Sequence, residues 1–131
     1  MKRLKLKNVS LITTVLNEVE NIDEFIKSVI KQSVLPEEFI IVDGGSTDGT
    51  YEILKKYARK YKWIKVYQVK GASIGKGRNY AIEKAKGKII ACTDAGCILD
   101  RNWLRKIIKP FFKNFVGAIC RTTVHYNKFF W

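Results

Sequence analysis

Three acidic side chains, Glu18, Asp43 and Asp94, each stand at or just after the end of a run of apolar residues. Short continuous apolar runs of this kind are typical of buried strands in a parallel sheet. The carboxyl ends of such strands open on one crevice at the edge of the sheet, where ligands bind. Carboxylates gathered there repel one another unless they hold a cation or accept hydrogen bonds. The pattern therefore suits ribose hydroxyls and an Mg²⁺ or Mn²⁺ ion.

Two cations, Lys76 and Arg78, lie at the end of the glycine-rich segment Gly71–Gly77, where a helix is expected to begin. Cationic side chains and free backbone N–H groups at a helix start suit a diphosphate. The segment has neither the spacing of a Walker loop nor that of a Rossmann fingerprint, because Asn17 and Glu18 follow the first strand where Gly-x-Gly would be needed.

Each acidic residue also has a purely structural explanation. Asp43 could hold the glycine turn that follows it, and Glu18 could be a solvated loop residue. Asp48 or Thr50 could cap the next helix, which for Asp48 is the stronger interpretation. The arrangement of several acids on successive strand ends is therefore more informative than any one of them.

Apolar periodicity predicts strands that alternate with helices along the whole chain. The expected strands are 9–16, 39–42, 63–69, 88–93 and 116–120, and the expected helices are 21–31, 53–61, 79–86 and 103–108. This order predicts an α/β fold of three layers, α/β/α, with a mostly parallel sheet.

Local signals mark the expected boundaries of these elements. Pro36 is expected in the loop before the second strand, and Gly87 is expected to stop the third helix. Asp100 is expected to cap the last helix, and Pro110 lies near its end.

The chain has 131 residues, about one domain, and 47% of them are hydrophobic, which is enough to form a core. No apolar run approaches the ~20 residues that span a bilayer. The basic start is not followed by the apolar segment of a secretory signal. We therefore expect a cytoplasmic location, with contact at the inner face of a membrane compatible with the positive charge.

The formal net charge of +13 favours anionic partners such as nucleotide phosphates, nucleic acid or an anionic membrane. A solvated lysine-rich surface explains the same excess equally well. The three cysteines, Cys92, Cys97 and Cys120, form no Cys-x-x-Cys, and His125 is the only histidine. Zinc is therefore improbable, and buried reduced thiols are expected.

Four motifs occur in a characteristic order: Val9 to Glu18 (VSLITTVLNE), Val42 to Thr50 (VDGGSTDGT), Gly77-Arg78-Asn79, and Thr93-Asp94-Ala95-Gly96. Together they make nearly the whole chain resemble the family 2 glycosyltransferases. The resemblance implies a GT-A fold and transfer of a sugar from a nucleotide-sugar, usually with inversion and with Mg²⁺ or Mn²⁺.

The resemblance also implies roles for particular residues. Thr14, Glu18 and Asp43 would line the nucleotide pocket, Arg78 would face the base or the diphosphate, and Asp94 would lie near the ribose and the metal. The complete set nominated for the nucleotide site is Thr14, Asn17, Glu18, Asp43, Lys76, Arg78 and Asp94, and Asp94 is the only nominated metal ligand.

Three departures from the family pattern affect these roles. Gly44 stands where a second tandem Asp is common, and Gly96 replaces the second acid of the Asp-x-Asp motif. The family's proline after the first strand is also absent, and Thr14 lies in that region. The metal ligands of the family are therefore incomplete here, unless Asp94 holds the ion with water and substrate phosphates.

We expect residues 1–131 to form a single domain that binds a UDP-, GDP- or other nucleotide-sugar. The acceptor-binding half and the catalytic base, which the family carries after the fifth strand, are expected outside it, supplied by further chain or by a partner subunit. The acceptor is expected to be a saccharide or a lipid-linked sugar. A basic module that binds nucleic acid or anionic membrane is the main alternative, and a nucleotidyltransferase is a weaker one because the first strand lacks a glycine-rich phosphate loop.

Overall fold

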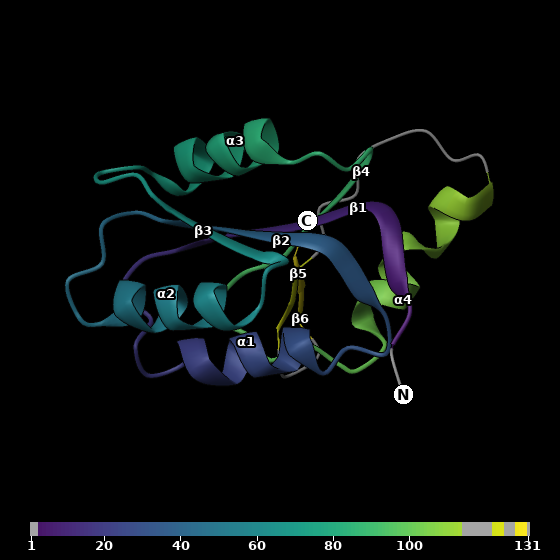
Figure 1. The fold of residues 1–131 in the computed structure, drawn as a ribbon, viewed down its shortest axis with the longest axis horizontal. Helices are drawn as coiled ribbons and strands as arrows, with labels where there is room; N and C mark the ends of the chain where they lie inside the picture. Colours follow the sequence, from purple (N-terminus) through teal and green to yellow (C-terminus); the bar gives the residue numbers. More distant parts are fainter. Residues whose placement is uncertain (1–2, 114–121, 125–127, 131) are drawn as a thin grey trace.

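The computed structural model describes residues 3–113, 122–124 and 128–130. Strands and helices alternate along the chain, as Figure 1 shows. The elements are β1 (Lys5–Val15), α1 (Ile22–Ile30), β2 (Leu35–Asp43), α2 (Thr50–Lys60), β3 (Ile64–Gln68), α3 (Ile74–Lys84), β4 (Ile89–Cys92), α4 (Trp103–Ile108), a 3₁₀ turn (Lys109–Lys113), β5 (Thr122–Val124) and β6 (Lys128–Phe130).

The main sheet has four strands in the order β3-β2-β1-β4, and all its neighbours are parallel. β1 pairs with β2 on one side and with β4 on the other, so the strand order reverses at β1. This reversal is the switch point at which ligands bind in open α/β sheets. β5 and β6 form a separate antiparallel pair.

Helices cover both faces of the main sheet: α1 and α2 lie on one face and α3 on the other (Figure 1). The strands alternate between these faces, as the period of two requires. Leu11 and Phe39 are buried in the cluster that includes α1, whereas Ile12, Ile40 and Val42 are buried with residues of α3. The predicted three-layer α/β/α arrangement is therefore confirmed.

β2 begins earlier than predicted, so Pro36 lies inside this strand and not in the loop before it. Pro36 pairs with Leu6 near the start of both strands, before an irregularity in the register between Leu6 and Ser10. A proline near the start of a strand removes only one donor from the ladder, and the pairing continues beyond it.

α3 also begins five residues before its predicted start, at Ile74, and residues 74–77 belong to its first turn and not to a loop. The Oγ of Ser73 caps this turn by accepting a hydrogen bond from the Lys76 N–H. The helix ends at Lys84, so Gly87 does not stop it. Gly87 is instead needed for packing, because a Cβ there would lie 2.6 Å from the Oγ of Ser10.

The predicted helix caps were wrong by one or two residues. The N-cap of α2 is Gly49, which has a positive φ of 103°, and Asp48 lies one residue further out. Its Oδ1 accepts a hydrogen bond from the Thr50 N–H at 3.0 Å. In α4 the N-cap is Asn102, and Asp100 accepts from its N–H. Both aspartates thus lie just outside their helix and accept hydrogen bonds from backbone N–H groups at its start.

Cys92 and Cys97 are buried thiols, as expected. The predicted strand 116–120, Cys120 and His125 lie outside the described residues. Across the described segments, no helix is both long enough and apolar enough to pass through a bilayer.

A buried carboxylate, Glu38, ties together the edge of the sheet opposite the strand ends. Its Oε2 accepts hydrogen bonds from the Oγ of Ser10 and from the Lys86 N–H, both at 2.6 Å. Its Oε1 lies 3.0 Å from the Nζ of Lys65. Burial raises the pKa of Glu38, but these hydrogen bonds and the Lys65 charge outweigh it and leave the pKa below its ordinary value.

We expect Glu38→Gln to lower the free energy of unfolding by about 2 kcal/mol at pH 7, because a charged acceptor is lost. The pKa of Glu38 is lower in the folded protein than in the unfolded chain, where it is near 4.3. The charged carboxylate therefore stabilises the fold above that pH, and this stabilisation is lost as the pH falls through the folded-state pKa. Urea unfolding of both proteins between pH 7 and pH 3 measures the difference, which should shrink below about pH 4.

The matched control is Glu37→Gln, since Glu37 is the exposed neighbour and accepts a hydrogen bond from the Asn8 N–H. Its effect should stay within about 0.5 kcal/mol. A Glu38→Gln difference that does not depend on pH would contradict the role assigned to the charge.

Candidate functional site

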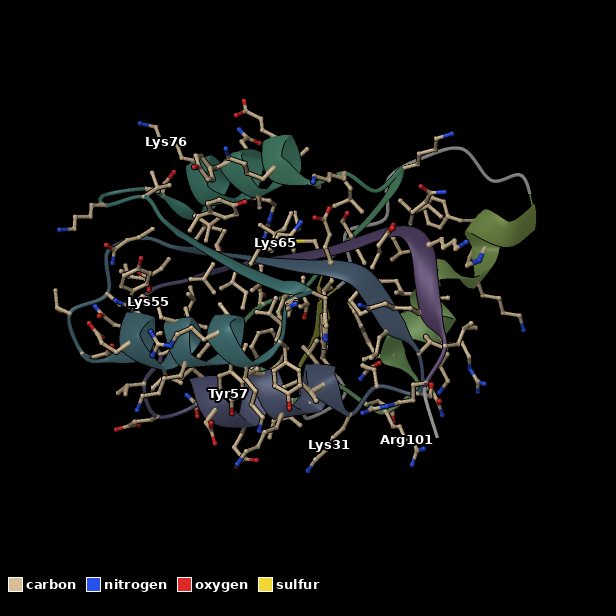
Figure 2. All side chains as sticks on the ribbon, viewed as in Figure 1. Lys31, Lys55, Tyr57, Lys65, Lys76 and Arg101 are labelled. Atoms are coloured by element: carbon tan, nitrogen blue, oxygen red, sulfur yellow. The ribbon has the colours of Figure 1, made fainter. Side chains whose placement is uncertain are left out.

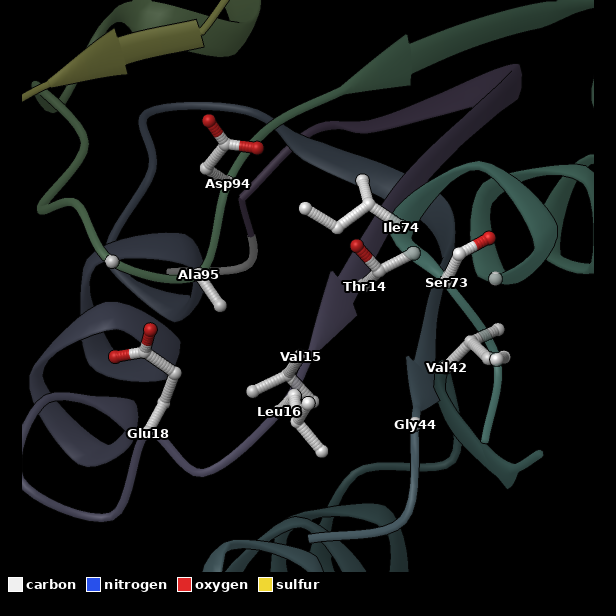
Figure 3. A pocket seen from close by; sticks show the side chains of 13 residues that line it. Thr14, Val15, Leu16, Glu18, Val42, Gly44, Ser73, Ile74, Asp94 and Ala95 are labelled. Carbon is white, nitrogen blue, oxygen red and sulfur yellow. The ribbon is translucent and has the colours of Figure 1, made fainter. Parts of the chain in front are cut away.

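A cavity of about 410 Å³ lies where β1, β2 and β4 end (Figure 3). Its volume is in the range of small-molecule sites. Its wall consists of Thr14, Val15, Leu16, Glu18, Val42, Gly44, Ala72, Ser73, Ile74, Gly77, Asp94, Ala95 and Gly96. The cavity therefore opens at the switch point beside β1, on the sheet edge where the sequence predicts a ligand site.

The two sides of the cavity differ in chemistry. Glu18 and Asp94 lie on one side with Ala95 between them, whereas Ser73 and Ile74, at the start of α3, lie across from them (Figure 3). One side is thus acidic, and the other presents the N-terminus of a helix.

Close packing of α3 on β1 sets the width of this cavity. A Cβ on Gly77 would lie 2.9 Å from the Cγ2 of Thr14, closer than real contacts allow. A Cβ on Gly44 would lie 3.2 Å from the carbonyl oxygen of Ala72, which is also tight. Glycine at these positions lets the start of α3 approach the ends of β1 and β2.

The start of α3 can attract an anion. The first N–H groups of a helix have no intrahelical partners, and the helix dipole places roughly half a positive charge there. The Ser73 side chain occupies the Lys76 N–H, and the Ser73 carbonyl accepts from the Gly77 N–H. Ser73 and Ile74, at this helix start, line the cavity, where a phosphate would benefit from the helix dipole.

Arg78 lies beside the acidic side of the site. Its Nη2 is 3.8 Å from the Oδ1 of Asp94, with both side chains partly exposed. Such a pair is weak in water because solvent screens it. The Nε of Arg78 is shielded from solvent and has no hydrogen-bond partner among the described residues. The guanidinium therefore has donors to spare next to the cavity.

The backbone holds Glu18 firmly between β1 and α1. Its N–H donates to the Oγ1 of Thr50 at 2.9 Å, and its carbonyl accepts from the Ile22 N–H at 2.7 Å. Within the part of the chain that the structure describes, its Oε2 accepts one long hydrogen bond of 3.4 Å, from the Nδ2 of Asn21.

Gly96 leaves open space on the acidic side. Apart from its two neighbours in the chain, the one described atom within 4 Å of a Cβ built there is the Oε1 of Glu18, at 3.9 Å. Among the described residues, no three His, Cys, Asp or Glu side chains gather to hold a metal. Mg²⁺ is commonly held by one or two carboxylates together with substrate phosphates, and the acids on this cavity wall are Glu18 and Asp94.

Two predicted site residues serve the loop after β2 and do not line the cavity. Asp43 is fully buried, and its Oδ1 accepts from the N–H groups of Gly45 and Ser46 at 2.8 Å. Asn17 has a positive φ of 51°, and its Oδ1 accepts from the Thr47 N–H. That either residue touches a nucleotide stays a prediction.

The cavity wall brings together Thr14, Glu18 and Asp94 of the predicted set, with Arg78 beside Asp94. Lys76 is exposed on the outer side of α3 and does not line the cavity (Figure 2).

Sequence reasoning missed Ser73 and Ile74 on the cavity wall because the helix was expected to begin later. Ser73 itself carried a usable signal, since serine is among the preferred N-cap residues.

Sequence comparison finds that residues 10–131 match the profile of glycosyl transferase family 2. The chain is 35% identical over 86 residues to a cholesterol galactosyltransferase of Borreliella burgdorferi, a match that covers 66% of the chain and 24% of that relative. It is 39% identical over 96 residues to TuaG of Bacillus subtilis, a putative teichuronic acid biosynthesis glycosyltransferase, with coverage of 72% and 36%. The chain therefore spans only about a quarter to a third of these relatives.

Solved structures share the fold. Residues 1–349 of Staphylococcus aureus TarS in complex with UDP superpose with a TM-score of 0.70 at 29% identity, covering 82% of this chain and 32% of that one. The mannosyltransferase PcManGT of Pyrobaculum calidifontis, in complex with GDP-Man and Mn²⁺, superposes with a TM-score of 0.64 at 24% identity, covering 72% and 29%. At this identity PcManGT supports the fold alone.

We expect Gly77→Ala to destabilise the protein by about 1–3 kcal/mol, because the new methyl group would overlap the Thr14 methyl group. Gly75→Ala is the matched control, since beyond its own helix and chain neighbours no described atom lies within 4 Å of a Cβ there. It should stabilise the helix by up to about 1 kcal/mol. Thermal and urea unfolding measure both changes.

The double variant Thr14→Ser/Gly77→Ala removes the overlapping Cγ2 and should recover at least half of the loss. If Gly77→Ala were as stable as Gly75→Ala, the close packing would not set the position of α3.

Proposed function

Because the chain belongs to glycosyl transferase family 2, we propose that its cavity binds the nucleoside diphosphate of a sugar donor for transfer to an acceptor hydroxyl. The observation that carries this proposal is the opposition of an acidic side, with Glu18 and Asp94, to the N-terminus of α3 across one cavity. These two sides match the two polar parts of a nucleotide-sugar, its hydroxyl groups and its diphosphate.

The diphosphate is assigned to the space between the start of α3 and Arg78. Free N–H groups at a helix start favour an anion, and a guanidinium binds phosphate oxygens through several donors. The unpartnered Nε of Arg78 supports this assignment, since a buried donor without a partner is costly.

The acidic side is assigned to the ribose and the sugar. Carboxylates at this edge accept hydrogen bonds from hydroxyl groups, and Asp94 stands at the position of the first acid of the family motif. Thr14 lies on the cavity wall beside the start of α3, where its hydroxyl can bond to the donor. A divalent cation bound at Asp94 would supply charge neutralisation for the diphosphate.

In the reaction we propose, the acceptor hydroxyl attacks the anomeric carbon, and its proton passes to a general base expected outside residues 1–131. The bond from the anomeric carbon to the nucleoside diphosphate breaks, with inversion of configuration. Negative charge grows on the leaving diphosphate, and Arg78 and the start of α3 stabilise it. The chain matches only part of its relatives, so this proposal concerns the donor site. The identity of the acceptor belongs to the whole protein.

One observation favours the alternative function, in which the basic chain binds an anion other than a nucleotide, such as nucleic acid or an anionic membrane. A second cavity of about 490 Å³ is lined by Arg3, Glu24, Lys27, Ser28, Lys31, Ile98, Leu99 and Arg101. Two of its cations are already engaged, because Lys27 pairs with Asp23 at 2.8 Å and Arg3 donates to backbone carbonyls.

The distribution of positive charge favours the nucleotide over this alternative. In Figure 2, Lys31 and Arg101 lie on the opposite face of the molecule from Lys76. Positive charge is therefore spread over both faces, as expected of a solvated surface. A nucleic-acid surface instead gathers its cations on one face.

Calorimetry with UDP, GDP and CDP, with and without Mn²⁺, tests the proposal. We expect one nucleotide to bind with a Kd between about 1 μM and 1 mM, and at least one of the others to bind more weakly. Arg78→Gln should weaken this binding about tenfold or more, because a charge-assisted contact to phosphate is lost. Absence of binding by any nucleotide to folded protein would contradict the proposal.

The matched control is Lys76→Gln, which removes the same charge two residues away but off the cavity wall, and it should bind the nucleotide like the unchanged protein. Short duplex DNA tests the alternative. Binding to a polyanion would weaken steeply between about 50 and 200 mM salt and would not distinguish bases.

A further inference from the structure

We propose that two buried donors, the hydroxyl of Thr13 and the thiol of Cys97, are positioning residues for the donor site, because they hold the two peptide groups on either side of the Asp94 Cα. This inference rests on the proposed function, since it concerns how the acidic side of the donor cavity keeps its shape. The observation behind it is a pair of hydrogen bonds to consecutive carbonyl oxygens, those of Thr93 and Asp94.

The segment that carries Asp94 has no regular structure. β4 ends at Cys92 and α4 begins at Trp103, so residues 93–102 between them belong to neither a strand nor a helix. Asp94 and the two residues after it nevertheless form part of the cavity wall (Figure 3). Residues on loops are placed less precisely than residues on strands, so a binding site there needs support from neighbouring side chains.

The first support comes from the main sheet. Thr13 is buried in β1, which lies between β2 and β4. Its Oγ1 donates a hydrogen bond of 2.6 Å to the carbonyl oxygen of Thr93, and the Thr93 N–H donates to the Ile12 carbonyl at 3.1 Å. The peptide group that leads into Asp94 is therefore fixed to the central strand.

The second support comes from the buried thiol of Cys97. Its Sγ donates a hydrogen bond of 2.8 Å to the carbonyl oxygen of Asp94, and the Oγ1 of Thr93 lies 3.5 Å from the same sulfur. A thiol has a single hydrogen, so the Thr93 hydroxyl is the donor of this second bond. Burial raises the pKa of the Cys97 thiol above its ordinary value, so the sulfur keeps its hydrogen at neutral pH.

Together the two bonds restrict the backbone at Asp94. A residue has only two soft backbone dihedral angles, φ and ψ, which set the peptide groups before and after its Cα. When both peptide groups are held, the direction of the Cα–Cβ bond is held as well. The Asp94 side chain is 51% exposed, so little else restrains it. The two donors thus set where this carboxylate begins without touching it.

The chain beyond Cys97 is itself anchored, which a positioning group requires. The Leu99 N–H donates to the Oγ of Ser28 in α1 at 3.0 Å. The fully buried Gln32 follows α1, and its Nε2 donates to the Asp100 carbonyl at 2.6 Å. The thiol is therefore held between the end of the sheet and α1.

The first measurement is ¹⁵N relaxation of the nucleotide-free protein. Cys97→Ala and Thr13→Val each remove one donor, and valine keeps the shape of threonine. We expect the order parameters of the Ala95 and Gly96 amides to fall from about 0.85 to below about 0.6 in both variants, while amides in β1 stay at about 0.85.

The second measurement is calorimetry with UDP and, separately, with GDP, at a temperature where each variant is folded. We expect both variants to bind the nucleotide about fivefold more weakly, the ratio that corresponds to one ordinary hydrogen bond. A merely structural role would lower the stability and leave the affinity of the folded protein unchanged.

The matched variants are Cys97→Ser and Thr13→Ser, which change the size of the side chain but keep a donor at each position. Both should keep the nucleotide affinity within about twofold of that of the unchanged protein and should preserve the order parameters of the turn. If one of the variants without a donor fails to fold, the other decides the outcome.

Unchanged nucleotide affinity or unchanged order parameters in both Cys97→Ala and Thr13→Val would overturn this inference while the proposed function stands. So would serine variants that bind as weakly as these two, because side-chain size and not the donor would then explain the loss. Failure of the unchanged, folded protein to bind either nucleotide would overturn the inference together with the proposed function.

Discussion

The site depends on one constraint, the position of β1 between β2 and β4 in a parallel sheet. Since all three strands run in the same direction, their carboxyl ends meet at one edge, and the segments that follow them are brought together there. The crossover after β3 must also pass over the other face of the sheet, which places α3 opposite α1 and α2. Glu18, Asp94 and the start of α3 therefore converge on one cavity although they are far apart in sequence.

Glycine determines how this convergence becomes a binding site, in two different ways. At Gly77 the absence of a side chain allows α3 to contact Thr14, so a helix N-terminus reaches the ends of the strands. At Gly96 the absence of a side chain leaves a space that the carboxylate of Glu18 borders. Glycine thus allows close packing at Gly77 and leaves open space at Gly96.

The sequence predicted the sheet and its ligand-binding edge because the signal was strong. The buried strands are continuous apolar runs, and Asp94 stands at the end of one of them. The start of α3 was not predictable from periodicity, because Gly75, Lys76 and Gly77 contribute no apolar stripe and the Ser73 cap decides the boundary. Asp43 ends its strand as predicted, yet its carboxylate turns into the loop to bind Gly45 and Ser46. That direction depends on turn geometry, which the alternation of residues does not encode.

The proposed site for the nucleoside diphosphate lies where β1, β4 and α3 meet. The most direct test is a titration of ¹⁵N-labelled protein with UDP, followed by two-dimensional nuclear magnetic resonance. We expect the largest shifts at the amides of Val15 to Glu18, Ile74 to Arg78 and Asp94 to Gly96, which surround the cavity. Largest shifts at Lys31 and Arg101, in the second cavity on the α1 side, would contradict the account.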